Sequence, residues 1–152
     1  MRKGITSTLR ALFIIALSII YIQVNAQKNE LEVDRVVIGH YKLADDELNE
    51  YVVQMKSGQV MFTDDRLGSG TLIGKANRDS YKAFETYVNA YDYSMFMLKY
   101  KQNKDYSYVR VYMSNGDYQE AYWNDVAGPE AQKFYTVAMK FIEQTRQTTA
   151  SK

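Results

Sequence analysis

Few residues in this chain of 152 could do acid–base, nucleophilic or metal chemistry. His40 is the only histidine and there is no cysteine, so a thiol nucleophile, a thiolate metal site and a His-pair metal site are excluded. A histidine inside an apolar, strand-like segment is more typical of a hydrogen-bonded structural residue than of a general base. We therefore interpret His40 as structural.

Two acidic clusters, Asp-Asp-Glu at 45–47 and Asp-Asp at 64–65, could supply oxygen ligands for calcium or carboxylates for acid–base work. Neither has the spacing of an EF-hand loop, and adjacent carboxylates in turns are usually solvated. The Gly-Ser-Gly at 68–70 forms neither a nucleophile elbow nor a phosphate-binding loop. The sequence therefore predicts no catalytic residue, no metal site and no cofactor.

Tyrosine is the residue type that stands out, with 14 in the chain. Several alternate with apolar residues in 106–113 (YSYVRVYM) and 118–123 (YQEAYW), which read as paired strands. A two-residue Asn-Gly turn between them would place Glu120 beside Val111 and bury a carboxylate among valines, which is costly. A three-residue loop with Gly116 as a left-handed bulge residue instead places Arg110 opposite Glu120. We predict the three-residue loop.

This register collects aromatic and charged side chains on one side of the sheet, and we name that set the tyrosine face. Tyrosine, methionine and arginine are enriched at recognition surfaces, so these residues are the candidate binding site. Its members are Met97, from a strand predicted over 94–100, and Tyr106, Tyr108, Arg110, Tyr112, Tyr118, Glu120 and Tyr122. Two structural interpretations stay open: the tyrosines stabilise strand pairing, or the N-terminal strands cover them as a second core.

The apolar periodicity of the rest of the chain predicts the strands and helices that position this face. Strands are predicted over 33–42, 51–56, 60–65, 70–74, 94–100, 106–113 and 118–123, and helices over 79–92 and from Pro129 onward. The segment 43–50 is predicted as a loop or a single helical turn, and Ser57-Gly58 as a hairpin turn. The fold class is α+β: an antiparallel sheet of about six strands with two helices packed on one face. A weak internal similarity suggests a duplicated βββα unit.

The predicted pairing also defines a core. The strand over 94–100 should pair Leu98 with Val109 and Phe96 with Val111. The residues expected to be mostly buried between sheet and helices are Phe84, Val88, Val109, Val111, Trp123, Phe134 and Phe141.

The first 26 residues are typical of a cleaved signal peptide. Arg2, Lys3 and Arg10 precede an apolar run from Ala11 to Ile22, and the segment ends on Ala26. The run is shorter than the roughly 20 apolar residues of a membrane-spanning helix, which disfavours the alternative of an uncleaved anchor. We expect cleavage after Ala26 and a single exported α+β domain over 27–152, in the periplasm or secreted.

The net charge of the chain after Ala26 restricts the class of partner. Three of the 19 basic residues and none of the 18 acidic ones lie before Gln27, so the remaining chain carries a formal charge of −2. That balance disfavours nucleic acid as a partner. We predict a noncatalytic binding domain for a protein, peptide or glycan of the cell envelope. The alternatives are a small cell-envelope hydrolase that uses the acidic loop residues, and a structural or assembly component.

Overall fold

A six-stranded antiparallel sheet dominates the computed structural model, which describes residues 32–64, 70–100 and 102–150. The strands run in the order β4-β3-β2-β1-β5-β6, so the first strand of the chain lies inside the sheet. The elements are β1 (Val33–Lys42), β2 (Glu47–Gln54), β3 (Gln59–Thr63), β4 (Thr71–Lys75), α2 (Arg78–Ala90), the short 3-10 helix η1 (Tyr93–Met95), β5 (Tyr106–Met113), β6 (Tyr118–Trp123) and α3 (Pro129–Ala150).

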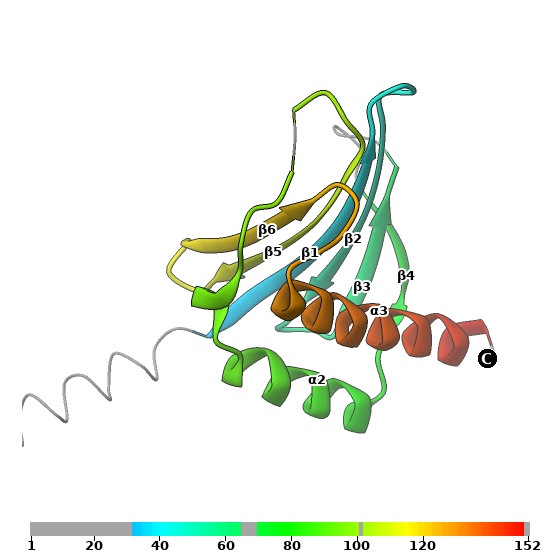
Figure 1. Ribbon diagram of the computed structural model, residues 1–152. Helices are drawn as coiled ribbons and strands as arrows, with labels where there is room; N and C mark the ends of the chain where they lie inside the picture. The colour runs from blue at the N-terminus through cyan, green and yellow to red at the C-terminus, as the bar shows by residue number, and fades with distance from the viewer. Residues whose placement is uncertain (1–31, 65–69, 101, 151–152) are drawn as a thin grey trace, which may run out of the picture. The chain divides into compact units, whose positions relative to one another are not determined.

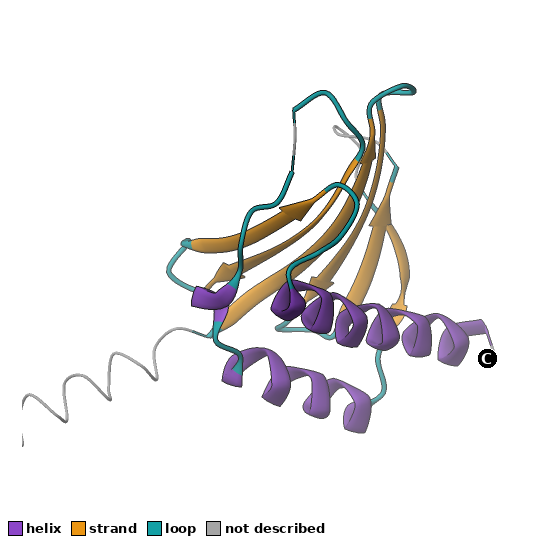
Figure 2. Ribbon diagram, in the orientation of Figure 1, coloured by secondary structure: helices purple, strands orange, loops and turns teal. Residues whose placement is uncertain are grey.

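Both helices cover the same face of the sheet, and no helix of the described chain covers the other face (Figures 1 and 2). The α+β prediction is therefore confirmed, whereas the duplicated unit stays a prediction. All seven residues expected in the core are buried: Phe84, Val88, Val109, Val111, Trp123, Phe134 and Phe141. The helices pack against this core, and the tyrosine face lies on the opposite side of the sheet.

Local signals in the sequence set the helix ends. The Asn77 side chain caps α2 by accepting a hydrogen bond from the Ser80 amide at 2.9 Å. The predicted helix over 79–92 is thus observed over Arg78–Ala90. Pro129 begins α3, as predicted, with Glu130 in the first turn near the positive end of the helix dipole. Between the helices, the rings of Phe84 and Phe141 stack with their centroids 4.2 Å apart.

The strand predicted over 94–100 is wrong. Residues Tyr93–Met95 form a 3-10 turn, and beyond it the chain only bridges the edge of β6, where the Lys99 amide donates to the Tyr122 carbonyl. Leu98, predicted to be in the core, is 59% exposed. Met95, Met97 and Leu98 therefore face solvent, whereas the Phe96 ring packs against Phe134 with centroids 5.6 Å apart. The segment adds one ring to the core but no sheet row.

The strand that pairs with β5 on this side is β1, not the segment at 94–100. Val109 pairs with Ile38, and Val111 with Val36, where the sequence had suggested Leu98 and Phe96. Val36 and Ile38 fill this core row, since both are almost fully buried.

The prediction of a loop or a single helical turn over 43–50 holds only for its first half, because residues 47–50 belong to a strand. A turn reverses the chain after β1, with Asp46 at a left-handed φ of 50°, and β2 then begins at Glu47. Polar residues can occupy this end of β2 because the backbone ladder to β1 holds them: Glu47 pairs with Lys42 and Asn49 with His40. The hairpin turn predicted at Ser57-Gly58 is confirmed, with Gly58 at φ 66°.

The predicted register of the last hairpin is confirmed. Arg110 pairs with Glu120, Tyr108 with Tyr122 and Tyr112 with Tyr118. Gly116 has a φ of 90°, and its amide donates to the Met113 carbonyl at 3.0 Å, as a bulged three-residue loop requires.

The predicted signal peptide, most of the Gly-Ser-Gly segment and Asp65 lie outside the described residues. Within the described ranges, no helix has both the length and the apolar character needed to cross a bilayer. From Val33 onward the chain forms one compact unit.

Candidate functional site: the tyrosine face

Arg110 is the organising residue of the tyrosine face. Its Nε donates to Glu120 Oε2 at 2.8 Å, its Nη1 to the Tyr112 hydroxyl at 3.2 Å and its Nη2 to the Tyr122 hydroxyl at 2.5 Å. The Tyr122 hydroxyl in turn donates to Glu120 at 2.7 Å. The ion-paired side chains are only 28% and 25% exposed, so the pair is partly desolvated and rigidly held.

Tyr108 belongs to the same row but is buried beneath the surface of the face. Its ring lies across Gly39 of β1, where a Cβ atom would overlap it, and its hydroxyl donates to Glu50 of β2. Only 5% of the residue is exposed. Tyr108, predicted as one of the binding residues of this face, is therefore not accessible to a partner; it supports the face from below.

Other tyrosine rings extend the patch from Tyr108 toward one end of the sheet. The centroids of Tyr106 and Tyr122 are 5.7 Å apart, and Tyr100 lies 5.1 Å from Tyr122 and 5.6 Å from Tyr106. These are ordinary separations for interacting aromatic pairs. At the opposite end, Tyr112 and Tyr118 pair at 5.6 Å, with Tyr118 51% exposed. The accessible part of the face is thus a band of tyrosine edges around one ion pair.

Met97 is not part of this band. It lies in the irregular segment after η1, with its methyl group near Gly128. The strand predicted over 94–100 would have placed Met97 opposite Arg110, but Val37 of β1 occupies that position, so the placement of Met97 on the tyrosine face is wrong.

Sequence reasoning missed the β1 and β2 members of the same face. Arg35 pairs with Tyr112, and its guanidinium carbon lies 4.0 Å from the centroid of that ring. Val37 pairs with Arg110 and is buried beside it. The alternation within 33–42 could have assigned these residues to one face, but only the observed β1–β5 pairing shows that it is the tyrosine face.

The buried tyrosines resist deprotonation. Burial raises the pKa of Tyr122 to about 12, and its hydrogen bond to Glu120 acts in the same direction. Burial also raises the pKa of Tyr108, aided by its hydrogen bond to Glu50. An unfolded tyrosine titrates near pH 10, so the unfolded chain releases these protons at lower pH than the folded protein does.

The free energy of unfolding should therefore fall as the pH rises from about 10 to 12, because the unfolded state binds fewer protons over that window. Tyr122→Phe removes one titrating group and should show a smaller loss between neutral pH and about pH 11 than wild type. Urea unfolding at both pH values measures it. Tyr118→Phe, at an exposed position, is the matched control, and an equal loss in Tyr122→Phe and wild type would contradict the assignment.

His40 lies at one end of β1, where its Nδ1 is 3.0 Å from the Ser107 hydroxyl oxygen on the neighbouring strand. The nearby carboxylate of Glu47 is held by other groups: hydrogen bonds from Asn49 and Lys42 do most to lower its pKa, and His40 contributes least. This is the geometry of a cross-strand structural contact.

The acidic cluster at 45–47 is likewise engaged in local structure. Asp46 accepts a hydrogen bond from the Tyr41 hydroxyl at 2.7 Å, and Glu47 forms an ion pair with Lys42 at 3.0 Å. In the ranges that the structure describes, no three metal-ligating side chains come together. These carboxylates stabilise the turn between β1 and β2.

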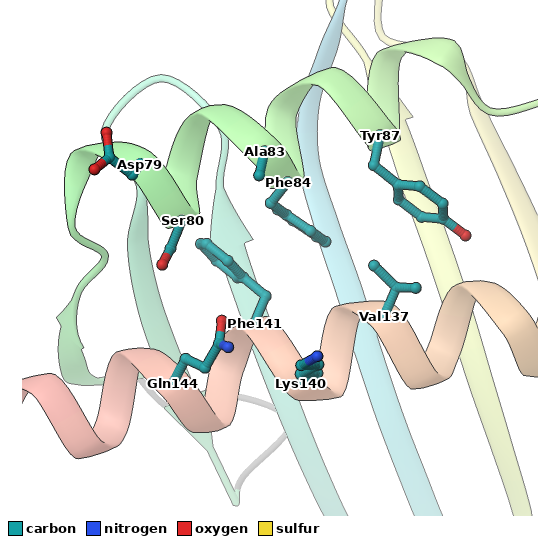
Figure 3. Close-up of a pocket in the computed structure, with 9 residues that line it drawn as sticks. All are labelled: Asp79, Ser80, Ala83, Phe84, Tyr87, Val137, Lys140, Phe141 and Gln144. Carbon is teal, nitrogen blue, oxygen red and sulfur yellow. The ribbon is translucent and has the colours of Figure 1, made fainter.

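A cavity of about 440 Å³ lies between α2 and α3 (Figure 3). The stacked rings of Phe84 and Phe141 line it together with Val137, and Lys140 and Gln144 of α3 lie at the same groove. Asp79 and Ser80 of α2 also line this cavity. The tyrosine face is the stronger candidate because its charged residues are held by a network of hydrogen bonds.

The fold and this face define a small α+β domain in which no described helix covers the sheet face of tyrosines and paired charge. Comparison with protein-family models, with curated proteins and with solved structures gives no significant match.

Proposed function

We propose that this chain is a noncatalytic, exported binding domain whose tyrosine face contacts a protein or peptide partner of the cell envelope. The observation that carries the proposal is the Arg110–Glu120 pair, held between tyrosine hydroxyls on the sheet face that no described helix covers. A pre-arranged band of tyrosine and arginine offers a large contact area at low entropic cost.

The accessible residues of the face should carry the binding energy. Tyr118 is the test position because it is 51% exposed, whereas Tyr108 is buried and its loss would damage the fold. Tyrosine is one of the residue types enriched among interface hot spots, which commonly contribute about 2 kcal/mol or more to binding. We therefore expect Tyr118→Ala to recover a specific envelope partner at least about tenfold less well than wild type.

The experiment is a quantitative pull-down from envelope extract with immobilised protein of residues 27–152. Val126→Ala, at an exposed apolar position in the loop before α3, is the matched control and should recover the partner like wild type. Melting curves of each variant exclude unfolding as the cause. Equal recovery of every partner by Tyr118→Ala and wild type eliminates the tyrosine face as the binding site.

Export is the second part of the proposal. The basic start, the apolar run over 11–22 and Ala26 support cleavage before Gln27. We expect the intact mass of the protein recovered outside the cytoplasm to correspond to a chain that begins at Gln27. A full-length product retained in the membrane fraction would show that the segment is an anchor.

A further inference from the structure

Arg35, which lines one cavity together with Glu50, is a cation of the tyrosine face whose side chain forms no ion pair with the described residues. Its Nε is buried and has no hydrogen-bond partner there, and the contact that fixes the side chain is stacking on the Tyr112 ring at 4.0 Å. Arg110, two residue pairs further along the β1–β5 ladder, has a partner for each of its three nitrogens. A buried Nε–H group without an acceptor is costly, and an added acceptor would relieve that cost.

A cavity of about 240 Å³ opens beside this guanidinium on the same face. Arg35 of β1 and Gln54 of β2 supply hydrogen-bond donors to it, and Val52 and Met61 supply apolar surface. Arg35 and Gln54 are direct cross-strand neighbours, so their donors lie at one end of the cavity. Glu50 also lines the cavity, and its carboxylate already accepts the Tyr108 hydroxyl.

We propose that this cavity binds a carboxylate of the peptide that occupies the tyrosine face, with Arg35 as its anchor. A guanidinium fixed by stacking presents a planar fork that matches a carboxylate in two parallel hydrogen bonds. The negative charge of Glu50 in the same cavity favours a singly charged carboxylate over a doubly charged phosphate. The carboxylate comes from an acidic side chain or from a peptide C-terminus.

This inference rests on the proposed function and names the chemistry of its partner. Three short probe peptides separate the two sources of the carboxylate. The first is acetyl-Tyr-Glu-Tyr-amide, the second is acetyl-Tyr-Gln-Tyr-amide, and the third is the second with a free C-terminal carboxylate. NMR titration of isotope-labelled protein follows the Arg35 Nε–H group and the Met61 methyl group.

At least one of the two carboxylate peptides should shift both signals and bind about tenfold or more tightly than the neutral one, as expected for a charge-assisted pair. The peptide that does so identifies the source of the carboxylate. Arg35→Gln should abolish this discrimination, and Arg35→Lys, which keeps the charge but loses the fork, should retain only part of it. Arg78→Gln, on α2, is the matched control. Equal binding of all three peptides, no shift at Arg35, or undiminished discrimination in Arg35→Gln overturns the proposal.

The same variants distinguish this failure from a failure of the proposed function. If the envelope pull-down depends on Tyr118 but Arg35→Gln recovers the partner like wild type, the face binds its partner without a carboxylate anchor. If Tyr118→Ala has no effect on recovery, the proposed function itself is wrong.

Discussion

Phe134→Ala should lower the free energy of unfolding by about 3–5 kcal/mol, the usual range for removing a fully buried aromatic ring. Phe134 is completely buried, and its ring lies within 5.0–5.8 Å of the rings of Tyr91, Tyr93, Phe96 and Tyr87. A small domain has only about 5–15 kcal/mol of stability, so the variant should be marginally folded. Urea unfolding followed by circular dichroism measures the loss.

Tyr118→Ala is the control, because it removes an aromatic ring from an exposed strand position. It should cost at most about 1 kcal/mol, the value of one cross-strand pair. A loss below about 1 kcal/mol for Phe134→Ala would mean that α3 is peripheral to the stability of the domain.

Gly39→Ala should destabilise the protein by about 1–3 kcal/mol, because the added methyl group overlaps the ring of Tyr108. Tyr108→Ala should cost about 3–5 kcal/mol by itself, since it removes a buried ring and the hydrogen bond to Glu50. In the double variant the methyl group has room. The loss should therefore be smaller than the sum of the two single losses, by about 0.5–3 kcal/mol.

Four unfolding curves complete this cycle: wild type, both single variants and the double variant. Gly128→Ala is the control for adding a methyl group at a glycine with only ordinary contacts around it. Strictly additive losses would show that the Tyr108 ring moves off Gly39 without cost, which would contradict its role as a support of the face.

The sequence alone was sufficient for the last hairpin and for both helices. The register of β5 and β6 followed from one energetic argument, that Glu120 cannot be buried among valines, and the Arg110–Glu120 pair confirms it. The helices followed from apolar spacing and, for the second, from Pro129. Each of these signals is local, so a single segment contains all the information needed.

The parts that failed depend on contacts distant in sequence. The segment at 94–100 looks as strand-like as β1, and only the competition for the edge of β5 decides between them. The cavity at Arg35 could not be predicted, because Arg35 meets Tyr112 through a pairing of strands far apart in the chain. Burial of Tyr108 likewise depends on a glycine in another strand.

The position of β1 inside the sheet also bears on the rate of folding. Hairpins join β1 to β4 in succession, but the residues of β5 that pair with β1 lie about 65 to 80 positions further along the chain. The first pair of the β1–β2 hairpin is only 5 positions apart, so closing the longer loop costs about 2 kcal/mol more in chain entropy. Docking of β5 should therefore be the slow step of refolding. Until β5 docks, the valine-rich edge of β1 that will pair with it stays open to other chains. The lifetime of this incomplete sheet therefore determines how readily the refolding protein aggregates.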